Sequence, residues 1–117
     1  MVAYDPKKSR NWKATAQEHF RRALADAGRG PLEGPVACAI VARFTCPKSD
    51  WRKREPMPRR PHAKRPAAEN VGKAVLDAGT GVAWLDDAQI VTLKIEKIIA
   101  AQGEAPGVEV WFQALDR

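Results

Sequence analysis

The stretch PVACAIVARFTCP, residues 35–47, alternates between two sets of side chains with a period of two residues. One set is entirely apolar: Val36, Cys38, Ile40, Ala42, Phe44 and Cys46. The other set is mixed: Ala37, Ala39, Val41, Arg43 and Thr45. Such alternation is typical of a β-strand that packs against a core. We therefore predict a strand with one face fully buried and the other partly buried.

Both cysteines of the chain, Cys38 and Cys46, lie in this predicted strand. Eight residues of extended chain separate them by about 26 Å, which is too far for a disulfide. Neither has a second ligand at a spacing that zinc sites use. We expect two buried, reduced thiols, as in proteins of a reducing compartment.

Two amphipathic helices are predicted, one before and one after this strand. Residues 11–27 place an apolar set on one helix face: Trp12, Ala16, Phe20, Ala23, Leu24 and Ala27. The second helix is predicted to begin at Pro66, where a missing N–H costs nothing, and to end at residues 79–81. Its core face would contain Val71, Ala74, Val75 and Ala78.

Two further strands are predicted near the C-terminus. QIVTLKIEKIIA, residues 89–100, should direct Val91, Leu93 and Ile95 inward. VEVWFQA, residues 108–114, follows a turn and is expected to lie antiparallel to it. The element order predicts one α+β domain over residues 1–117, with a small mixed β-sheet packed by two helices.

The sequence gives no sign of a membrane or secreted protein. The longest apolar runs are interrupted by charges and fall short of the ~20 residues that span a bilayer. The first residues, MVAYDPKKSRNW, contain no apolar signal core. We expect a cytoplasmic protein.

The net charge of +6 is concentrated in residues 48–65. This segment sets eight basic residues against two acids: Lys48, Arg52, Lys53, Arg54, Arg59, Arg60, Lys64 and Arg65 against Asp50 and Glu55. The loop at 47–66 also holds five of the nine prolines, so we expect it to be extended and mobile, without regular structure. A basic excess gathered in one stretch favours a polyphosphate partner such as nucleic acid, and the alternative is a solvated loop.

Four charged residues around the second helix form a candidate site. Glu69 and Lys73 are four residues apart on one helix face, and Asp86 and Asp87 precede the strand at 89–100. Two adjacent Asp residues repel each other, and we expect folding to gain nothing from placing them beside apolar neighbours. Mg²⁺ prefers carboxylate oxygens and substrate phosphates, so the set favours a metal–phosphate site. The alternatives are a surface ion pair and a solvated acidic turn.

These residues resemble the RusA family of Holliday junction resolvases, which are phage-associated endodeoxyribonucleases. The family pattern is roughly K-P-D-x-D-N-x-x-K, then a helix with Asp-Ala, then D-D-x-Q-I/V-V. RPAAENVGK at 65–73 and DDAQIV at 86–91 match its two parts, with DA at 77–78 between them. AYDPKKSRNW at 3–12 is similar to the family's Tyr-x-Pro-Lys-Lys segment, and FTCPKSDWRKR at 44–54 to its strand and basic loop. The resemblance covers nearly the whole chain.

The resemblance implies a homodimer that binds a four-way DNA junction in recombination and repair, in a bacterial or phage-infected cell. It also implies symmetric nicking of two strands with Mg²⁺, or with Mn²⁺ in its place. The metal-binding acids map onto position 67, Glu69 and Asp87, with Asp86 adjacent, and the catalytic lysine onto Lys73. The candidate DNA contacts are Arg52, Lys53, Arg54, Arg59, Arg60, His62, Lys64, Arg65 and Asn70.

Two positions depart from the family pattern. Residue 67 is Ala where the family has Asp, and Glu69 replaces an Asp. Loss of a carboxylate should weaken metal binding and hydrolysis strongly. Ala67 marks either a weakened homologue or an engineered substitution that traps an uncleaved state, and we favour the second because the rest of the motif is retained. The sequence also begins at the Tyr-x-Pro segment, where the family usually has a strand first.

Three hypotheses of function follow from these features. The first is a junction-cutting nuclease impaired by Ala67. The second is a non-catalytic junction- or DNA-binding protein that keeps the fold and the basic loop. The third is an interaction domain whose basic loop is merely solvated.

Overall fold

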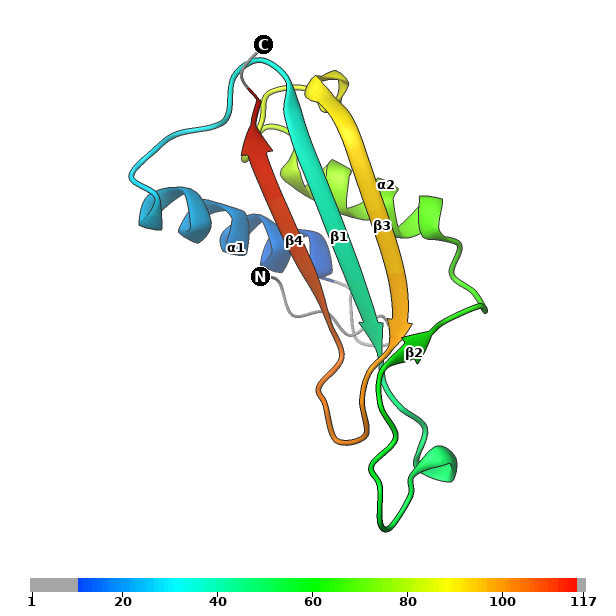
Figure 1. The fold of residues 1–117 in the computed structure, drawn as a ribbon. Helices are drawn as coiled ribbons and strands as arrows, with labels where there is room; N and C mark the ends of the chain where they lie inside the picture. Colours follow the sequence, from blue (N-terminus) through cyan, green and yellow to red (C-terminus); the bar gives the residue numbers. More distant parts are fainter. Residues whose placement is uncertain (1–10, 116–117) are drawn as a thin grey trace.

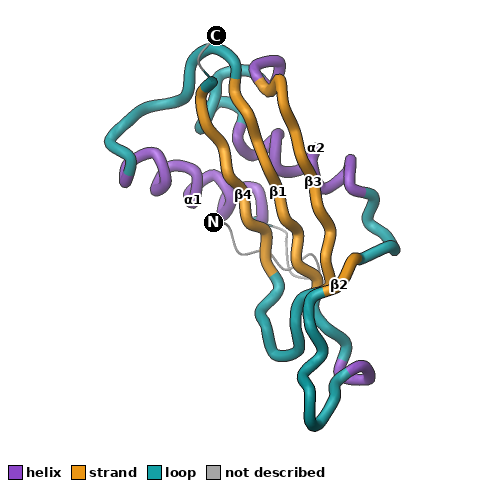
Figure 2. Tube along the Cα trace, in the orientation of Figure 1, coloured by secondary structure: helices purple, strands orange, loops and turns teal. Residues whose placement is uncertain are grey.

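A four-stranded mixed sheet forms the centre of the computed structural model, which describes residues 11–115. Its strands are β1 (Val36–Phe44), β2 (Arg60–Pro61), β3 (Ile90–Ile99) and β4 (Gly107–Ala114), in the spatial order β2-β3-β1-β4. Two helices, α1 (Trp12–Asp26) and α2 (Ala68–Gly79), both lie on one face of this sheet (Figures 1 and 2). The predicted α+β class, with two helices on a small mixed sheet, is confirmed.

β1 is an inner strand of the sheet. It runs parallel to β3, with Ile40 opposite Ile95, and antiparallel to β4, with Ile40 opposite Val110. The last strand is antiparallel to the preceding one, as predicted, but the two are not neighbours, because β1 lies between β4 and β3. A parallel pair needs a long crossover connection, and here the crossover from β1 to β3 contains the basic loop and α2.

Aromatic rings form the core between the sheet and the helices. Trp84 is fully buried, and its ring meets Phe20 of α1 at 5.7 Å and Phe112 of β4 at 5.9 Å, both edge to face. The predicted core faces are confirmed at ten positions: Ala16, Phe20, Leu24, Val36, Cys38, Ile40, Ala42, Cys46, Val75 and Ala78. They were wrong at Ala27 and Ala74, which are exposed. Cys38 and Cys46 are buried and free, as expected.

The start of α2 differs from the prediction. The helix begins at Ala68 with Ala67 as its N-cap, so Pro66 is not the first helical residue. Pro66 follows a cis peptide bond, and Ala67 is extended at φ −66° and ψ 148°. On β3, the Nζ of Lys97 donates to the carbonyl oxygens of Lys64 and Pro66, both at 2.6 Å. Lys97 therefore ties the segment before α2 to the sheet.

β3 is less buried than its alternation predicts. Val91 is 60% exposed and Leu93 is 41% exposed, so the prediction that both face a closed core was wrong. Ile95 is partly buried because α2 crosses the strand there: a Cβ on Gly72 would lie 2.5 Å from the Cδ1 of Ile95. The part of β3 that precedes this crossing is not covered by the helix. The helix-side face of β3 is therefore covered near its middle and open toward its start.

The basic arm, residues 47–66, is more ordered than expected. It contains a 3₁₀ turn, η2 (Lys48–Asp50), and the two residues of β2, so the prediction of no regular structure was wrong. Gln102, in the turn between β3 and β4, accepts hydrogen bonds from the backbone N–H groups of Arg52 and Met57 and donates to the carbonyl of Arg52. The arm and this turn project together beyond one end of the sheet (Figures 1 and 2).

Ion pairs fasten the base of the basic arm to the sheet. Arg43 of β1 is 8% exposed and donates to the carboxylate of Glu109 on β4. Glu104, in the β3–β4 turn, accepts from the guanidinium of Arg59 and from the backbone N–H of Ala101. The bond from Arg59 and that from Ala101 lower the pKa of Glu104 to about 2. The positive charge of Arg59 is thus partly neutralised by Glu104 within the protein.

Gly79 tests the packing of α2 on the core. A Cβ at this position would lie 2.4 Å from Cζ2 of Trp84, a ring that is fully buried and has no free space to move into. We expect Gly79→Ala to lower the free energy of unfolding by about 1–3 kcal/mol through overpacking. Urea unfolding followed by far-UV circular dichroism measures this, with Gly30→Ala as the control, because a Cβ there meets nothing within 4 Å. Equal urea midpoints for the two variants would contradict this prediction, because they would show that the core around Trp84 accommodates the extra methyl group.

Glu104 gives the stability a pH dependence. Its pKa is about 2 in the folded protein, against ~4.3 for an unperturbed Glu. A depressed pKa contributes stability that is present above ~4.3 and is lost as the pH falls toward 2. We expect the wild-type chain to exceed Glu104→Gln in urea midpoint at pH 6, and this difference to shrink steadily below pH 4.5. Glu33→Gln, at an exposed acid, should show no such trend, and a constant difference for Glu104→Gln would contradict the assignment.

Candidate functional site

The first turns of α2 form one wall of a groove beside β3. Glu69, Asn70 and Lys73 line it from the helix, and Leu93 and Ile95 line it from the strand. Gly72 allows this close approach, since a Cβ there would lie 2.5 Å from the Cδ1 of Ile95, whose side chain would have to shift. The predicted acid, amide and lysine of this turn are therefore brought together on one surface.

Glu69 and Lys73 are both free to act on something outside the chain. Both are exposed, and no ion pair or side-chain hydrogen bond joins either of them to another residue in the described range 11–115. The alternative of a surface Glu69–Lys73 ion pair is therefore not what the structure shows. An unpaired carboxylate and ammonium on one groove can meet a cation and a phosphate respectively.

The Asp-Asp-x-Gln turn turns out to have a structural role as well. Asp86 caps the short 3₁₀ helix η3 (Asp87–Gln89), and its Oδ1 accepts from the N–H of Ala88 at 2.8 Å. Gln89 completes the capping box: its Oε1 accepts from the N–H of Asp86, and its Nε2 donates to the carbonyls of Leu32 and Gly34. The expectation that folding gains nothing from this turn was therefore wrong.

Asp87 is the carboxylate that this turn leaves available. It is exposed, and within residues 11–115 its side chain has no hydrogen bond or ion pair, whereas Asp86 is engaged as the cap. The two adjacent acids thus have different surroundings. Of the pair, Asp87 is the better candidate for a ligand.

One chain does not gather the predicted metal ligands. Among residues 11–115 no three His, Cys, Asp or Glu side chains lie close enough to hold a metal ion. Asp87 precedes the start of β3, whereas Gly72, one turn after Glu69, lies against Ile95. The five residue-to-residue steps of extended strand from Ile90 to Ile95 alone span about 16 Å. Ligands of one Mg²⁺ each lie at about 2.1 Å from the ion, so Glu69 and Asp87 of the same chain do not share one.

Ala67 lies where an Asp side chain would be accommodated. It is exposed, extended and the N-cap of α2, with no side-chain hydrogen bond to the first turn. Asp is among the favoured N-cap residues. A carboxylate at this position would adjoin the groove of Glu69 without disturbing the core.

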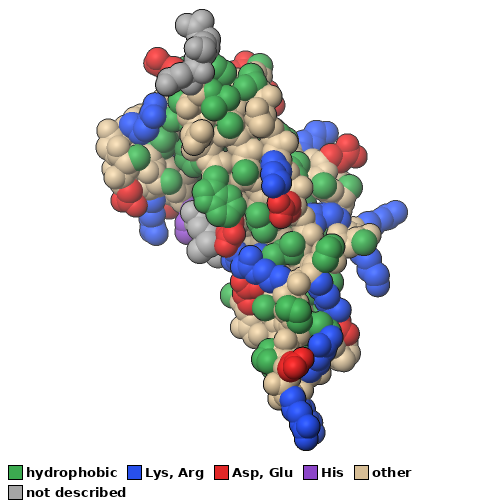
Figure 3. All heavy atoms as spheres, viewed as in Figure 1, with side chains coloured by type: hydrophobic (Ala, Val, Ile, Leu, Met, Phe, Trp, Pro, Cys, Tyr) green, Lys and Arg blue, Asp and Glu red, His purple; other side chains and the backbone are tan. Residues whose placement is uncertain are grey.

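The predicted DNA contacts divide into two groups. Arg52, Lys53, Arg54, Lys64 and Arg65 are exposed and have no ion pair within the described part of the chain. Arg59 and Arg60 are instead paired with Glu104 and Asp50. Figure 3 shows Lys and Arg side chains along the projecting arm as far as its end. The basic charge predicted for a phosphate backbone is therefore presented on a protrusion.

His62 has a packing role that its sequence context did not indicate. Its ring stacks on Phe44 at 4.4 Å with an interplanar angle of 16°. Burial, and then the charge of Lys97, lowers the pKa of His62, which favours the neutral ring at pH 7. A neutral, stacked imidazole is a weaker phosphate ligand than the free cation.

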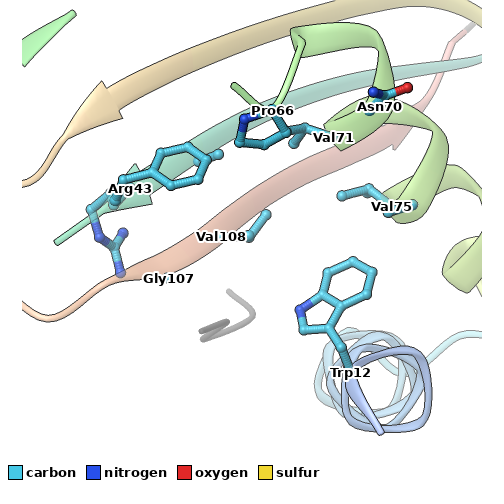
Figure 4. A pocket seen from close by; sticks show the side chains of 11 residues that line it. Trp12, Arg43, Pro66, Asn70, Val71, Val75, Gly107 and Val108 are labelled. Atoms are coloured by element: carbon cyan, nitrogen blue, oxygen red, sulfur yellow. The ribbon is translucent and has the colours of Figure 1, made fainter. Parts of the chain in front are cut away.

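An apolar cavity of about 240 Å³ lies on the other side of α2 (Figure 4). Trp12 of α1, Val71 and Val75 of α2 and Val108 of β4 border it. Among the described residues, its lining contains no acid. Sequence reasoning missed this cavity because its walls come from four separate segments. It also missed the role of Lys97. Lys97 alternates in register with Leu93 and Ile95, so the sequence places it on the helix-side face of β3, where a lysine needs hydrogen-bond partners.

Comparison with known proteins agrees with this assembly of features. No curated protein sequence matches the chain. The family model described as endodeoxyribonuclease RusA matches residues 2–112, a range that includes the basic arm, α2 and the Asp-Asp-x-Gln turn. The Tyr-x-Pro-Lys-Lys segment falls within the match but outside the described residues. The chain therefore belongs to the RusA endodeoxyribonuclease family, the Holliday junction resolvases.

Proposed function

We propose that this protein is a structure-selective nuclease that binds four-way DNA junctions and, as a homodimer, nicks two strands symmetrically with Mg²⁺ or Mn²⁺. The observation that carries the proposal is the family match over residues 2–112, because it spans both the basic arm and the groove of Glu69 and Lys73. The proposed setting is recombination and repair in the cytoplasm of a bacterial or phage-infected cell. Within residues 11–115, no helix is long and apolar enough to cross a membrane.

The proposal gives each group a role that its surroundings support. Arg52, Lys53 and Arg54 are exposed and unpaired on the arm, so they can neutralise backbone phosphates without reading sequence. Lys73 would stabilise charge on the phosphate oxygens at the cut, with Asn70 beside it in the groove. Glu69 and Asp87 are the proposed metal ligands, which must come from two chains if they are to meet at one ion.

Ala67 is proposed to impair this chain. Hydrolysis of a phosphodiester with one fewer carboxylate near the metal should be slow. The second candidate function, a non-catalytic junction-binding protein, is favoured by this one observation. It would keep the fold and the basic arm and would need no metal.

Restoring the carboxylate separates the two functions. We expect Ala67→Asp to raise cleavage of a labelled four-way junction in Mg²⁺ or Mn²⁺ by at least an order of magnitude. It should also stabilise the fold by about 1 kcal/mol by capping α2. In the same background, Lys73→Ala and Asp87→Asn should abolish cleavage and leave junction binding intact in a gel-shift assay. Junction binding without cleavage by Ala67→Asp would support the non-catalytic function instead.

The basic arm should dominate binding. We expect Lys53→Ala with Arg54→Ala to weaken junction affinity and to reduce the slope of log K against log salt by about 2, one unit for each lost phosphate contact. Fluorescence anisotropy over 50–200 mM salt measures both quantities. Arg21→Ala with Arg22→Ala is the matched control, because those exposed arginines lie on α1 and pair with Glu18. An equal effect of the two double variants would show that binding follows net charge rather than the arm.

A further inference from the structure

Trp51 is a large apolar side chain that the basic arm leaves in solvent. It is 46% exposed and lies between η2 and the basic run of the arm, the Arg-Lys-Arg at residues 52–54. Within residues 11–115 no aromatic ring packs against it, and it takes no part in the core, where Trp84 is fully buried. The packing of the fold therefore does not require a tryptophan at this position.

The indole of Trp51 is held in place by the chain's own hydrogen bonds. Its Nε1–H donates to the carbonyl oxygen of Cys46, a buried residue, at 3.3 Å. Its backbone N–H donates to the carbonyl of Lys48 at 3.1 Å, and the next residue, Arg52, is bonded through both its N–H and its carbonyl to Gln102. A side chain fixed in this way loses little conformational entropy when a partner contacts it.

The fixed ring offers its apolar face to a partner. The N–H is the only hydrogen-bond donor of an indole, and it is already used within the arm. Contact with this ring therefore selects a partner by shape and stacking, and not by hydrogen bonding. Nucleobases stack on aromatic side chains in this way, whatever the base, because every base has a planar π-face.

Positive charge surrounds the ring. Lys48 and the basic run at 52–54 are exposed, and none of these residues is in an ion pair within the described part of the chain. Asp50, the acid next to Trp51 in sequence, is paired with Arg60. An aromatic ring among free cations is the combination that binds unpaired nucleic acid, because the cations neutralise phosphates while the ring stacks on a base.

An anionic lipid surface matches this arm less well. A tryptophan at a membrane interface keeps its N–H at the wet, headgroup side, whereas that of Trp51 donates to Cys46. Binding to lipid also scales with the apolar area that is buried, and Trp51 is the one large apolar side chain exposed between residues 47 and 66. The observations therefore favour a nucleobase.

We infer that Trp51 stacks on an unpaired DNA base at the branch point of a junction, while the neighbouring cations hold the phosphates on either side. The inference rests on the proposed function and adds a residue that distinguishes branched from linear DNA. Phosphate contacts are available on any duplex, so the cations alone give no preference for a junction. In a linear duplex the bases are already stacked and paired, so a base face is accessible to Trp51 only where strands part.

Replacing the ring tests its contribution to affinity. We expect Trp51→Ala to weaken binding of a four-way junction about tenfold, through the loss of one stacked base, and to change binding of a linear duplex less than about twofold. Trp51→Phe should keep most of the junction affinity, whereas Trp51→Leu should behave as Trp51→Ala, because only an aromatic ring stacks. Trp111→Ala is the matched control, since Trp111 is 55% exposed on β4 opposite Ala39 of β1 and not on the arm. Fluorescence anisotropy measures each affinity.

The salt dependence separates a lost stack from a displaced arm. Trp51→Ala removes no charge, so we expect the slope of log K against log salt to equal that of the wild-type chain. A smaller slope, together with equal losses for junction and duplex, would show that the ring only holds the basic run in place, and overturns the inference. Unchanged junction affinity in Trp51→Ala, or full affinity in Trp51→Leu, overturns it as well.

A photo-crosslink tests the contact itself. 5-Iododeoxyuridine is placed either at the branch point or within one duplex stem of the junction, and the irradiated complex is analysed by mass spectrometry. We expect Trp51 to crosslink to the base at the branch point and not to the base within the stem, and the crosslink to persist in Trp111→Ala. Crosslinking of Trp51 at both positions, or at neither, contradicts stacking at the branch point.

The outcomes keep this inference apart from the proposed function. If the wild-type chain binds the junction and Trp51 has none of these effects, the inference is overturned and the function stands. If the chain binds the junction through Trp51 but Ala67→Asp does not cut, the nuclease function fails and the stacking stands. If the chain binds no DNA at low salt, both fail, and binding of phosphatidylserine vesicles that Trp51→Ala abolishes would identify a lipid surface as the partner of the arm instead.

Discussion

The parallel pairing of β1 with β3 is the constraint on which the rest of the structure depends. A parallel neighbour cannot be reached by a hairpin, so the chain must return along the full length of the sheet between Phe44 and Ile90. That return contains the basic arm, α2 and the Asp-Asp-x-Gln turn, which are the elements of the candidate site. It also places Glu69 and Asp87 beside different positions along β3. The geometry of the acids is therefore a consequence of the sheet order.

Sequence patterns predicted the parts of this fold that depend on local periodicity. Strict alternation identified β1, and spacings of three and four residues identified the buried faces of α1 and α2 at Phe20, Leu24 and Val75. The antiparallel direction of β4 relative to β3 was predicted, but neighbour relations between strands were not accessible in this way, and no local pattern shows that β1 lies between them. Burial of Val91 and Leu93 was also overestimated, since alternation shows which residues share a face but not how far a helix covers it.

The candidate site shows the same division. Glu69 and Lys73 were correctly placed on one surface because helical spacing alone determines that. The separate roles of Asp86 and Asp87 follow from a local capping box, in which Asp86 accepts from Ala88 and Gln89 accepts from Asp86. The spacing of Asp86 and Gln89 was a usable signal for it, whereas the bonds from Gln89 to Leu32 and Gly34, more than fifty residues away, lie in no local pattern. The arm was expected to be mobile from its prolines, and the bonds that order it come from Gln102 on a distant turn.

The central claim is that Glu69 of one chain and Asp87 of another meet at one cation. Paramagnetic broadening of backbone amide signals by sub-stoichiometric Mn²⁺ tests it directly, in the Ala67→Asp protein. The account predicts that signals at the start of α2 and in η3 broaden together, and that Glu69→Gln removes the effect from both. Broadening confined to one of the two elements, or broadening of η3 that persists unchanged in Glu69→Gln, would contradict it.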